Sequence, residues 1–198
     1  MKTTTNITYP TFALFAFACF ALLQNAQAVV PPPDGGYANQ NTAEGTDALF
    51  SLTTGEDNTA LGFQALYNGT TAGGNTAVGS GALFSNTDGS DNTAVGYQAL
   101  YSNTSGGGDN AFGFGALSSN ISGIRNLAVG SGALGSLTSG DSNVAVGNIA
   151  LFQGVTVNFN TALGRRALFR SQGDQNVGLG FFAGVNLNDG GTNNKSSI

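Results

Sequence analysis

The sequence contains no histidine and no tryptophan, and its single cysteine, Cys19, lies in an apolar stretch near the N-terminus. One cysteine cannot form an internal disulfide, and the lack of histidine removes the usual general base and the commonest zinc ligand. Charged residues make up 9% of the chain and the net charge is −5, which argues against nucleic acid as a partner. We therefore expect a protein that is not an enzyme and holds no cofactor or metal.

The N-terminal region has the features of a secretory signal. An apolar stretch from Phe12 to Leu23 precedes Ala26-Gln27-Ala28, which has the small-x-small form of a cleavage site. The stretch is shorter than the roughly 20 residues that a spanning helix needs. Residues 1–28 are therefore predicted to be a signal peptide, and residues 29–40 a Pro/Gly-rich linker. The predicted location is extracellular, either free or associated with the cell surface or outer membrane.

A 17-residue repeat occupies positions 41–184 and is followed by a polar tail, 185–198. Strings such as NTALGFQAL, NTAVGYQAL and NTALGRRAL recur without insertions, and we number positions in each copy from the leading residue, position 0. The leads are Asn41, Asn58, Asn75, Asn92, Asp109, Asn126, Asn143 and Asn160. A ninth, degenerate copy begins at Asn176, one residue earlier than the period requires.

Four further positions hold one residue type through the first eight copies, and position +7 holds alanine, from Ala48 to Ala167. Position +2 holds alanine, including Ala60, Ala77, Ala94, Ala111, Ala128 and Ala145. Position +4 holds glycine, including Gly62, Gly79, Gly96, Gly130 and Gly147. Position +8 holds leucine, including Leu66, Leu83, Leu100, Leu134, Leu151 and Leu168.

Seventeen residues are too few for the helix pairs of helical repeat proteins, whose units run to about 33 residues or more. Two short strands with their turns fit this length. The predicted fold is therefore all-β, a single-stack parallel β-solenoid with about eight full coils plus one degenerate coil. At about 4.8 Å per coil, eight coils give a rod roughly 38 Å long.

Stacking turns each repeated position into a ladder with its own expected role. Lead asparagines are expected to hydrogen-bond along the stack at a turn, and the glycines to mark a bend with positive φ. The leucines are expected to form the core. Position +3 holds a second apolar ladder, from Leu61 to Leu163. If this ladder also fills the coil, strand alternation turns the +2 alanines outward, where a strip of small residues would contact another chain. The sequence thus predicts a homo-oligomer.

Three ranks of side chains raise the question of ligand binding. Aromatic residues at position +9 form a broken ladder, from Phe50 to Phe169, for which a sugar-binding strip and stacking in a core or interface are alternatives. Threonines at positions +1 and +12 resemble an ice-binding face, although Ile121, Val155 and Leu127 interrupt them.

Carboxylates near the coil junctions, Asp57, Asp91, Asp109, Asp141 and Asp174, raise the question of a calcium site. One carboxylate per coil is too few for a shell of about six to eight oxygens. These residues are therefore interpreted as solvated turn residues.

The repeated NTAVGxxAL string resembles the YadA-like head repeats of trimeric autotransporter adhesins over residues 41–184. The resemblance implies a left-handed parallel β-roll, a trimer, and adhesion to matrix, host or glycan ligands. The expected function is a secreted structural or adhesive head without catalysis. The alternative is a soluble ligand-binding β-solenoid that binds ice or glycan. The polar tail has neither a coiled-coil stalk nor a barrel, so no self-encoded membrane anchor is expected.

Overall fold

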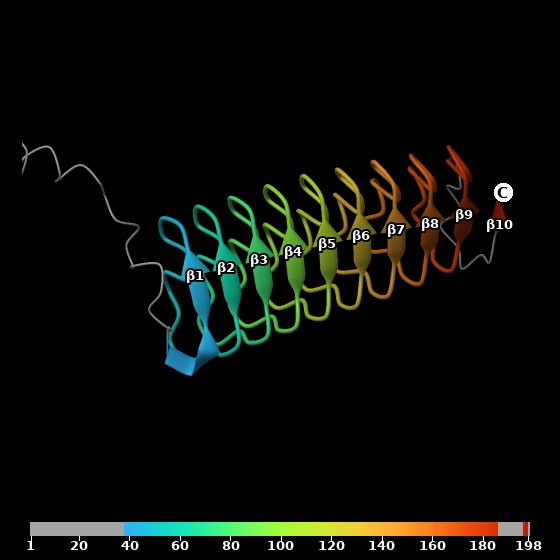
Figure 1. Cartoon of the computed structure of the whole chain (residues 1–198). Helices are drawn as coiled ribbons and strands as arrows, with labels where there is room; N and C mark the ends of the chain where they lie inside the picture. Colours follow the sequence, from blue (N-terminus) through green and yellow to red (C-terminus); the bar gives the residue numbers. More distant parts are fainter. Residues whose placement is uncertain (1–37, 186–195, 198) are drawn as a thin grey trace, which may run out of the picture.

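A computed structural model describes residues 38–185 and 196–197, and the repeat array forms a straight rod in which each 17-residue copy makes one coil (Figure 1). A short 3-10 turn, η2 (Ala38–Gln40), precedes the first coil. The strands are β1 (Thr42–Glu44), β2 (Thr59–Leu61), β3 (Thr76–Val78), β4 (Thr93–Val95), β5 (Asn110–Phe112), β6 (Leu127–Val129), β7 (Val144–Val146), β8 (Thr161–Leu163), β9 (Val177–Leu179) and β10 (Ser196–Ser197).

The strands form one parallel sheet in sequence order, from β1 to β10. The register pairs equivalent positions of adjacent copies, for example Ala60 with Ala77 and Leu61 with Val78. The predicted parallel β-solenoid with 17-residue coils is therefore confirmed. Each coil contains one strand of three residues, whereas the sequence suggested two. The turns replace the second strand, and they also bond from coil to coil, as Leu66 N–H does to the Ala82 carbonyl at 2.9 Å.

Four ladders make up most of the interior of the rod: the lead residues, the alanines at +2 and +7, and the leucines at +8. The +8 leucines from Leu66 to Leu168 are fully buried, as predicted. The lead side chains point inward too, so alternation along the strand directs +2 inward and +1 and +3 outward.

The prediction that the +2 alanines form an outward oligomer face is wrong. Ala60, Ala77, Ala94, Ala111, Ala128 and Ala145 are all 0% exposed. The reason is space. In the ninth copy Gly178 takes the +2 position, and a Cβ added there would lie 2.8 Å from Leu168 Cγ. The +8 leucine shares the interior with +2, so +2 holds a small residue, and the larger +3 side chains lie outside.

The glycine ladder at +4 has the predicted positive φ, between 111° and 137°. A Cβ added at Gly96 would lie 2.5 Å from the carbonyl oxygen of Gly113, the equivalent glycine one coil away. Backbone in this φ region is essentially restricted to glycine, and the close stacking excludes a side chain independently. The ladder therefore fixes both the bend and the close approach of successive coils.

The remaining predictions concern segments outside the described residues. The signal peptide at 1–28, almost all of the linker at 29–40 and most of the tail at 185–198 fall there, and they stay predictions. Within the described part of the chain, no helix has the length and apolar character needed to cross a membrane.

Candidate functional site

The lead asparagines form a continuous hydrogen-bonded ladder inside the rod. The backbone N–H and side-chain Nδ2 of Asn75 both donate to Asn58 Oδ1, at 3.0 and 3.1 Å. Asn75 Nδ2 also donates to the Gly89 carbonyl at 3.0 Å. Equivalent bonds link Asn41, Asn58, Asn92, Asn126, Asn143 and Asn160 into the same ladder. These side chains are buried and bonded to one another, so their role is structural.

A second inner stack of asparagines was not predicted. Position +11 holds Asn86, Asn103 and Asn120, all buried, in three successive coils. Asn103 Nδ2 donates to Asn86 Oδ1 at 2.8 Å, and Asn120 Nδ2 donates to Asn103 Oδ1 at 3.0 Å. The signal in the sequence is the recurrence of asparagine at the same position in three adjacent copies, where other copies hold leucine, glycine or serine.

Asp109 takes the lead position in the fifth coil and is fully buried, so its interpretation as a solvated turn residue is wrong. Its Oδ1 accepts hydrogen bonds from the backbone N–H and Nδ2 of Asn126, at 2.7 and 3.0 Å, and its Oδ2 accepts from Asn120 Nδ2 at 2.9 Å. Burial nevertheless raises the pKa of the Asp109 carboxyl to about 7, and the charge of Asp141 adds to the rise.

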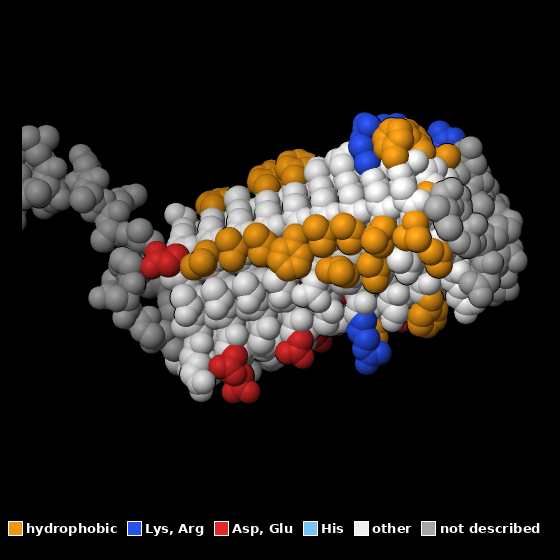
Figure 2. All heavy atoms as spheres, turned by 45° about the vertical axis from the view of Figure 1, so that its right-hand side comes forward, with side chains coloured by type: hydrophobic (Ala, Val, Ile, Leu, Met, Phe, Trp, Pro, Cys, Tyr) orange, Lys and Arg blue, Asp and Glu red, His pale blue; other side chains and the backbone are white. Residues whose placement is uncertain are grey.

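The outer face of the sheet carries an apolar stripe, formed by position +3 of successive coils. Its members are half-buried or exposed, and Phe112, Leu163 and Leu179 are 38–40% exposed. The other members are Leu61, Val78, Val95, Val129 and Val146. Figure 2 shows hydrophobic side chains in a continuous line along the rod, with few charges beside them. The stripe therefore extends along the rod from β2 to β9.

Aromatic residues form two further ranks on the surface. At +9, Phe50, Tyr67, Phe84 and Tyr101 stack with ring centroids 5.0–5.2 Å apart and nearly parallel planes. The rings stack as one of the two alternatives expected, but Phe50 is exposed and the other three are half-buried, so the stack lies at the surface and not in a core. Stacking in an interface and the sugar-binding strip stay predictions. At +5, Tyr97 and Phe114 stack at 5.3 Å. The exposed ring faces at the edge of these ranks offer flat apolar contact area.

The threonine hydroxyls at +12 make hydrogen bonds within the rod. The hydroxyls of Thr53, Thr70 and Thr87 each donate to the backbone carbonyl of position +12 in the next coil, at 2.9–3.1 Å. These donors therefore reinforce the stack. The ice-binding alternative stays a prediction.

The described residues contain no cluster of three or more His, Cys, Asp or Glu side chains able to hold a metal ion. Near the C-terminal end, Arg166 lies between the rings of Phe169 and Phe182, with its guanidinium carbon 5.6 and 5.2 Å from the ring centroids. This arrangement packs the arginine against the last coils. The described surface thus carries ranks of apolar and aromatic side chains along the rod.

Comparison of the chain with protein-family models, with curated proteins and with solved structures finds no match.

Proposed function

We propose that the chain is a secreted structural or adhesive head in which copies of the rod pack side by side through the apolar stripe. The observation that supports this most is the stripe itself, because it runs through every coil from β2 to β9 and leaves apolar side chains in contact with water. The signal peptide predicted at residues 1–28 supports secretion, and the NTAVGxxAL repeats support an adhesin-like head. Matrix, host or glycan molecules are the proposed ligands.

A second copy of the chain suits the stripe better than a partner of irregular shape. Stripe residues recur once per coil, at about 4.8 Å. Another rod carries the same residues at the same spacing, so each coil can bury its apolar residue against an equivalent coil along the whole length. Glu44 takes the stripe position in the first coil and ends the apolar line with a charge. The resemblance to trimeric heads favours three chains around a common axis.

Charging the stripe is expected to separate the copies. The double variant Val95→Lys/Val129→Lys places two ammonium groups in the centre of the proposed interface, where each would have to be desolvated on assembly. We expect the wild-type chain to show the mass of an oligomer in light scattering after size exclusion, and the variant to show the mass of a monomer.

The matched control is Ser105→Lys/Ser139→Lys. It adds the same charge to the same two coils, at exposed turn positions away from the stripe. Its oligomeric mass should equal that of the wild type. A wild-type chain that is monomeric at micromolar concentration would contradict the oligomeric head.

A further inference from the structure

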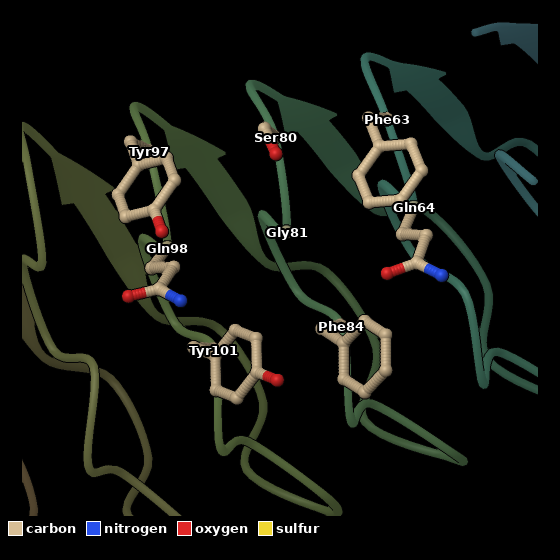
Figure 3. A pocket seen from close by; sticks show the side chains of 8 residues that line it. All are labelled: Phe63, Gln64, Ser80, Gly81, Phe84, Tyr97, Gln98 and Tyr101. Carbon is tan, nitrogen blue, oxygen red and sulfur yellow. The ribbon is translucent and has the colours of Figure 1, made fainter. Parts of the chain in front are cut away.

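A gap interrupts the aromatic rank at position +5. The three coils led by Asn58, Asn75 and Asn92 hold Phe63, Ser80 and Tyr97 at this position. Phe63 and Tyr97 are about half exposed, at 52% and 49%. Between them, the middle coil has a short Ser80 side chain followed by Gly81, which is buried and has none. A hollow of about 130 Å³ lies at this point. Figure 3 shows the side chains that line it.

The gap has the dimensions of one missing ring. Where adjacent +5 residues are both aromatic, as at Tyr97 and Phe114, the rings stack with centroids 5.3 Å apart and an interplanar angle of 15°. Ser80 is one coil from Phe63 and one coil from Tyr97. A ring-shaped group placed over Ser80 would therefore have an aromatic neighbour on each side at stacking distance, within the range of about 4.5–7 Å that aromatic contacts prefer.

The polar groups around the gap are neutral and available. The side-chain amides of Gln64 and Gln98 and the hydroxyl of Ser80 line it, together with the phenol groups of Tyr97 and Tyr101 (Figure 3). Within the described part of the chain, none of these side chains makes a hydrogen bond to protein. No charged residue lines the hollow. Its ligand is therefore expected to be uncharged, with an apolar face and many hydroxyl or amide groups at its rim.

We propose that this gap, which we name the Ser80 notch (Phe63, Gln64, Ser80, Gly81, Tyr97 and Gln98), binds a pyranose unit of a neutral glycan. A pyranose ring has C–H groups on its faces, which pack against aromatic rings, and equatorial hydroxyls at its rim, which both donate and accept hydrogen bonds. Glutamine amides and tyrosine or serine hydroxyls are matching partners. The inference names the ligand class of the adhesive head and so rests on the proposed function.

The stack of Phe50, Tyr67, Phe84 and Tyr101 runs beside the notch and extends it along the rod. Phe84 and Tyr101 line the hollow, and their rings are 5.0 Å apart in a nearly parallel stack. Neighbouring sugar units of a chain bound in the notch would meet further ring edges along this rank. We therefore expect oligosaccharides to bind more tightly than single sugars.

The test uses the variant Ser80→Phe in the full chain. The new ring completes the rank from Phe63 to Phe114 and occupies the notch, and the flanking coils already carry aromatic residues at this position, so the coil should tolerate it. Probes are the neutral hexasaccharides cellohexaose, laminarihexaose, mannohexaose and maltohexaose, titrated by calorimetry, with adenosine as a flat aromatic probe. We expect at least one hexasaccharide to bind the wild type, and its affinity to fall about tenfold or more in Ser80→Phe, because the new ring takes the place of the sugar between the two aromatic walls.

The matched control is Ser131→Phe. Ser131 also holds position +5 and is also followed by glycine, Gly132, but the flanking coils carry Phe114 on one side and Asn148 on the other. This variant should bind like the wild type. A second variant, Phe63→Ala/Tyr97→Ala, removes both walls from exposed positions and should also lose binding, whereas Phe159→Ala, another exposed aromatic residue, should not.

Three results would overturn the inference: no hexasaccharide binds the wild type, only adenosine binds, or Ser80→Phe leaves glycan affinity unchanged. Light scattering of the same samples tests the proposed oligomeric head separately from the glycan site. An oligomer that binds no glycan contradicts the Ser80 notch alone. A monomer that binds glycan contradicts the packing of rods through the apolar stripe and leaves the notch standing.

Discussion

Replacing Gly96 with alanine is expected to destabilise the rod strongly, because the added methyl group has no room between two successive coils. The φ of Gly96 is 137°, and an added Cβ would lie 2.5 Å from the Gly113 carbonyl oxygen and 2.7 Å from its carbon. Backbone strain alone costs about 1–3 kcal/mol. The clash adds to it, because relief requires separating two coils whose strands β4 and β5 are hydrogen-bonded in register. We expect a total cost above about 3 kcal/mol.

The measurement is the urea and thermal midpoint of unfolding by circular dichroism. Midpoints are compared directly, because long repeat arrays do not always unfold in two states. The control is Gly115→Ala. Gly115 also has positive φ, 59°, but the nearest atom to an added Cβ is Ser118 Oγ at 3.9 Å, and other coils hold Gln98 or Ile149 at this position. Equal midpoints for the two variants would show that the close approach of the glycine ladder is unimportant.

Replacing Asp109 with asparagine is expected to stabilise the chain at neutral and higher pH and to remove most of its pH dependence between about 4 and 7. Burial raises the pKa of this carboxyl from 3.8 to about 7 in the folded chain. Between about pH 4 and pH 7 the folded state therefore keeps a proton on Asp109 that the unfolded state has released. The contribution of the Asp109 carboxyl to the free energy of unfolding is fully present below pH 4 and is lost as the pH rises through 7. The loss amounts to up to about 4 kcal/mol.

Asparagine fits this position because the neighbouring coils already show the resulting arrangement. In the coil led by Asn92, Nδ2 of Asn92 and Nδ2 of Asn103 both donate to the Gly106 carbonyl, at 2.8 and 2.9 Å. In Asp109→Asn the same pair of donors would face the Gly123 carbonyl. The Tm of the variant should exceed that of the wild type at pH 8 and approach it at pH 4.

Asp91→Asn removes the same formal charge at an exposed turn with a left-handed backbone, φ 60°, which asparagine adopts readily. Its Tm should follow that of the wild type across the pH range. A wild-type Tm that does not fall between pH 4 and pH 8 would contradict the buried protonation of Asp109.

The period of the repeat was sufficient to predict the parallel solenoid, the asparagine ladder and the glycine bend. Each of these depends on one residue type recurring at one position, and stacking then fixes its surroundings. The prediction of which strand side chains point into the rod was wrong, because it placed the larger apolar residues at +3 in the interior. Inside a coil this small, Leu100 and its equivalents take most of the width, so Ala94 lies inside and Val95 outside. The volume of the side chain, and not its hydrophobicity, decides which of the two residues lies inside.

The left-handed backbone of the leucine ladder could not be predicted from the sequence. All eight leucines at +8 have φ between 48° and 52°. Isolated leucine disfavours this region. Here the leucine N–H donates to the next coil and the leucine carbonyl accepts from its own coil. Leu83 N–H donates to the Ala99 carbonyl at 3.0 Å, and Asn86 N–H donates to the Leu83 carbonyl at 3.2 Å. The fold therefore imposes a conformation that leucine alone disfavours. The Ser80 notch could not be predicted either, because it depends on positions +5 and +9 lying together at the surface of the rod.

The shortened eighth repeat shows where the chain tolerates a change of length. Backbone bonds at +12 run from coil to coil, from Thr53 N–H through to Thr138 N–H, which donates to the Val155 carbonyl. The coil led by Asn160 is one residue shorter than the others, and strands β8 and β9 still pair in register, Leu163 with Leu179. The missing residue is absorbed in the turn between Phe169 and Asn176. Insertions or deletions of a few residues should therefore accumulate in this turn during evolution, whereas duplication or loss of a whole 17-residue unit would lengthen or shorten the rod while keeping every surface rank aligned.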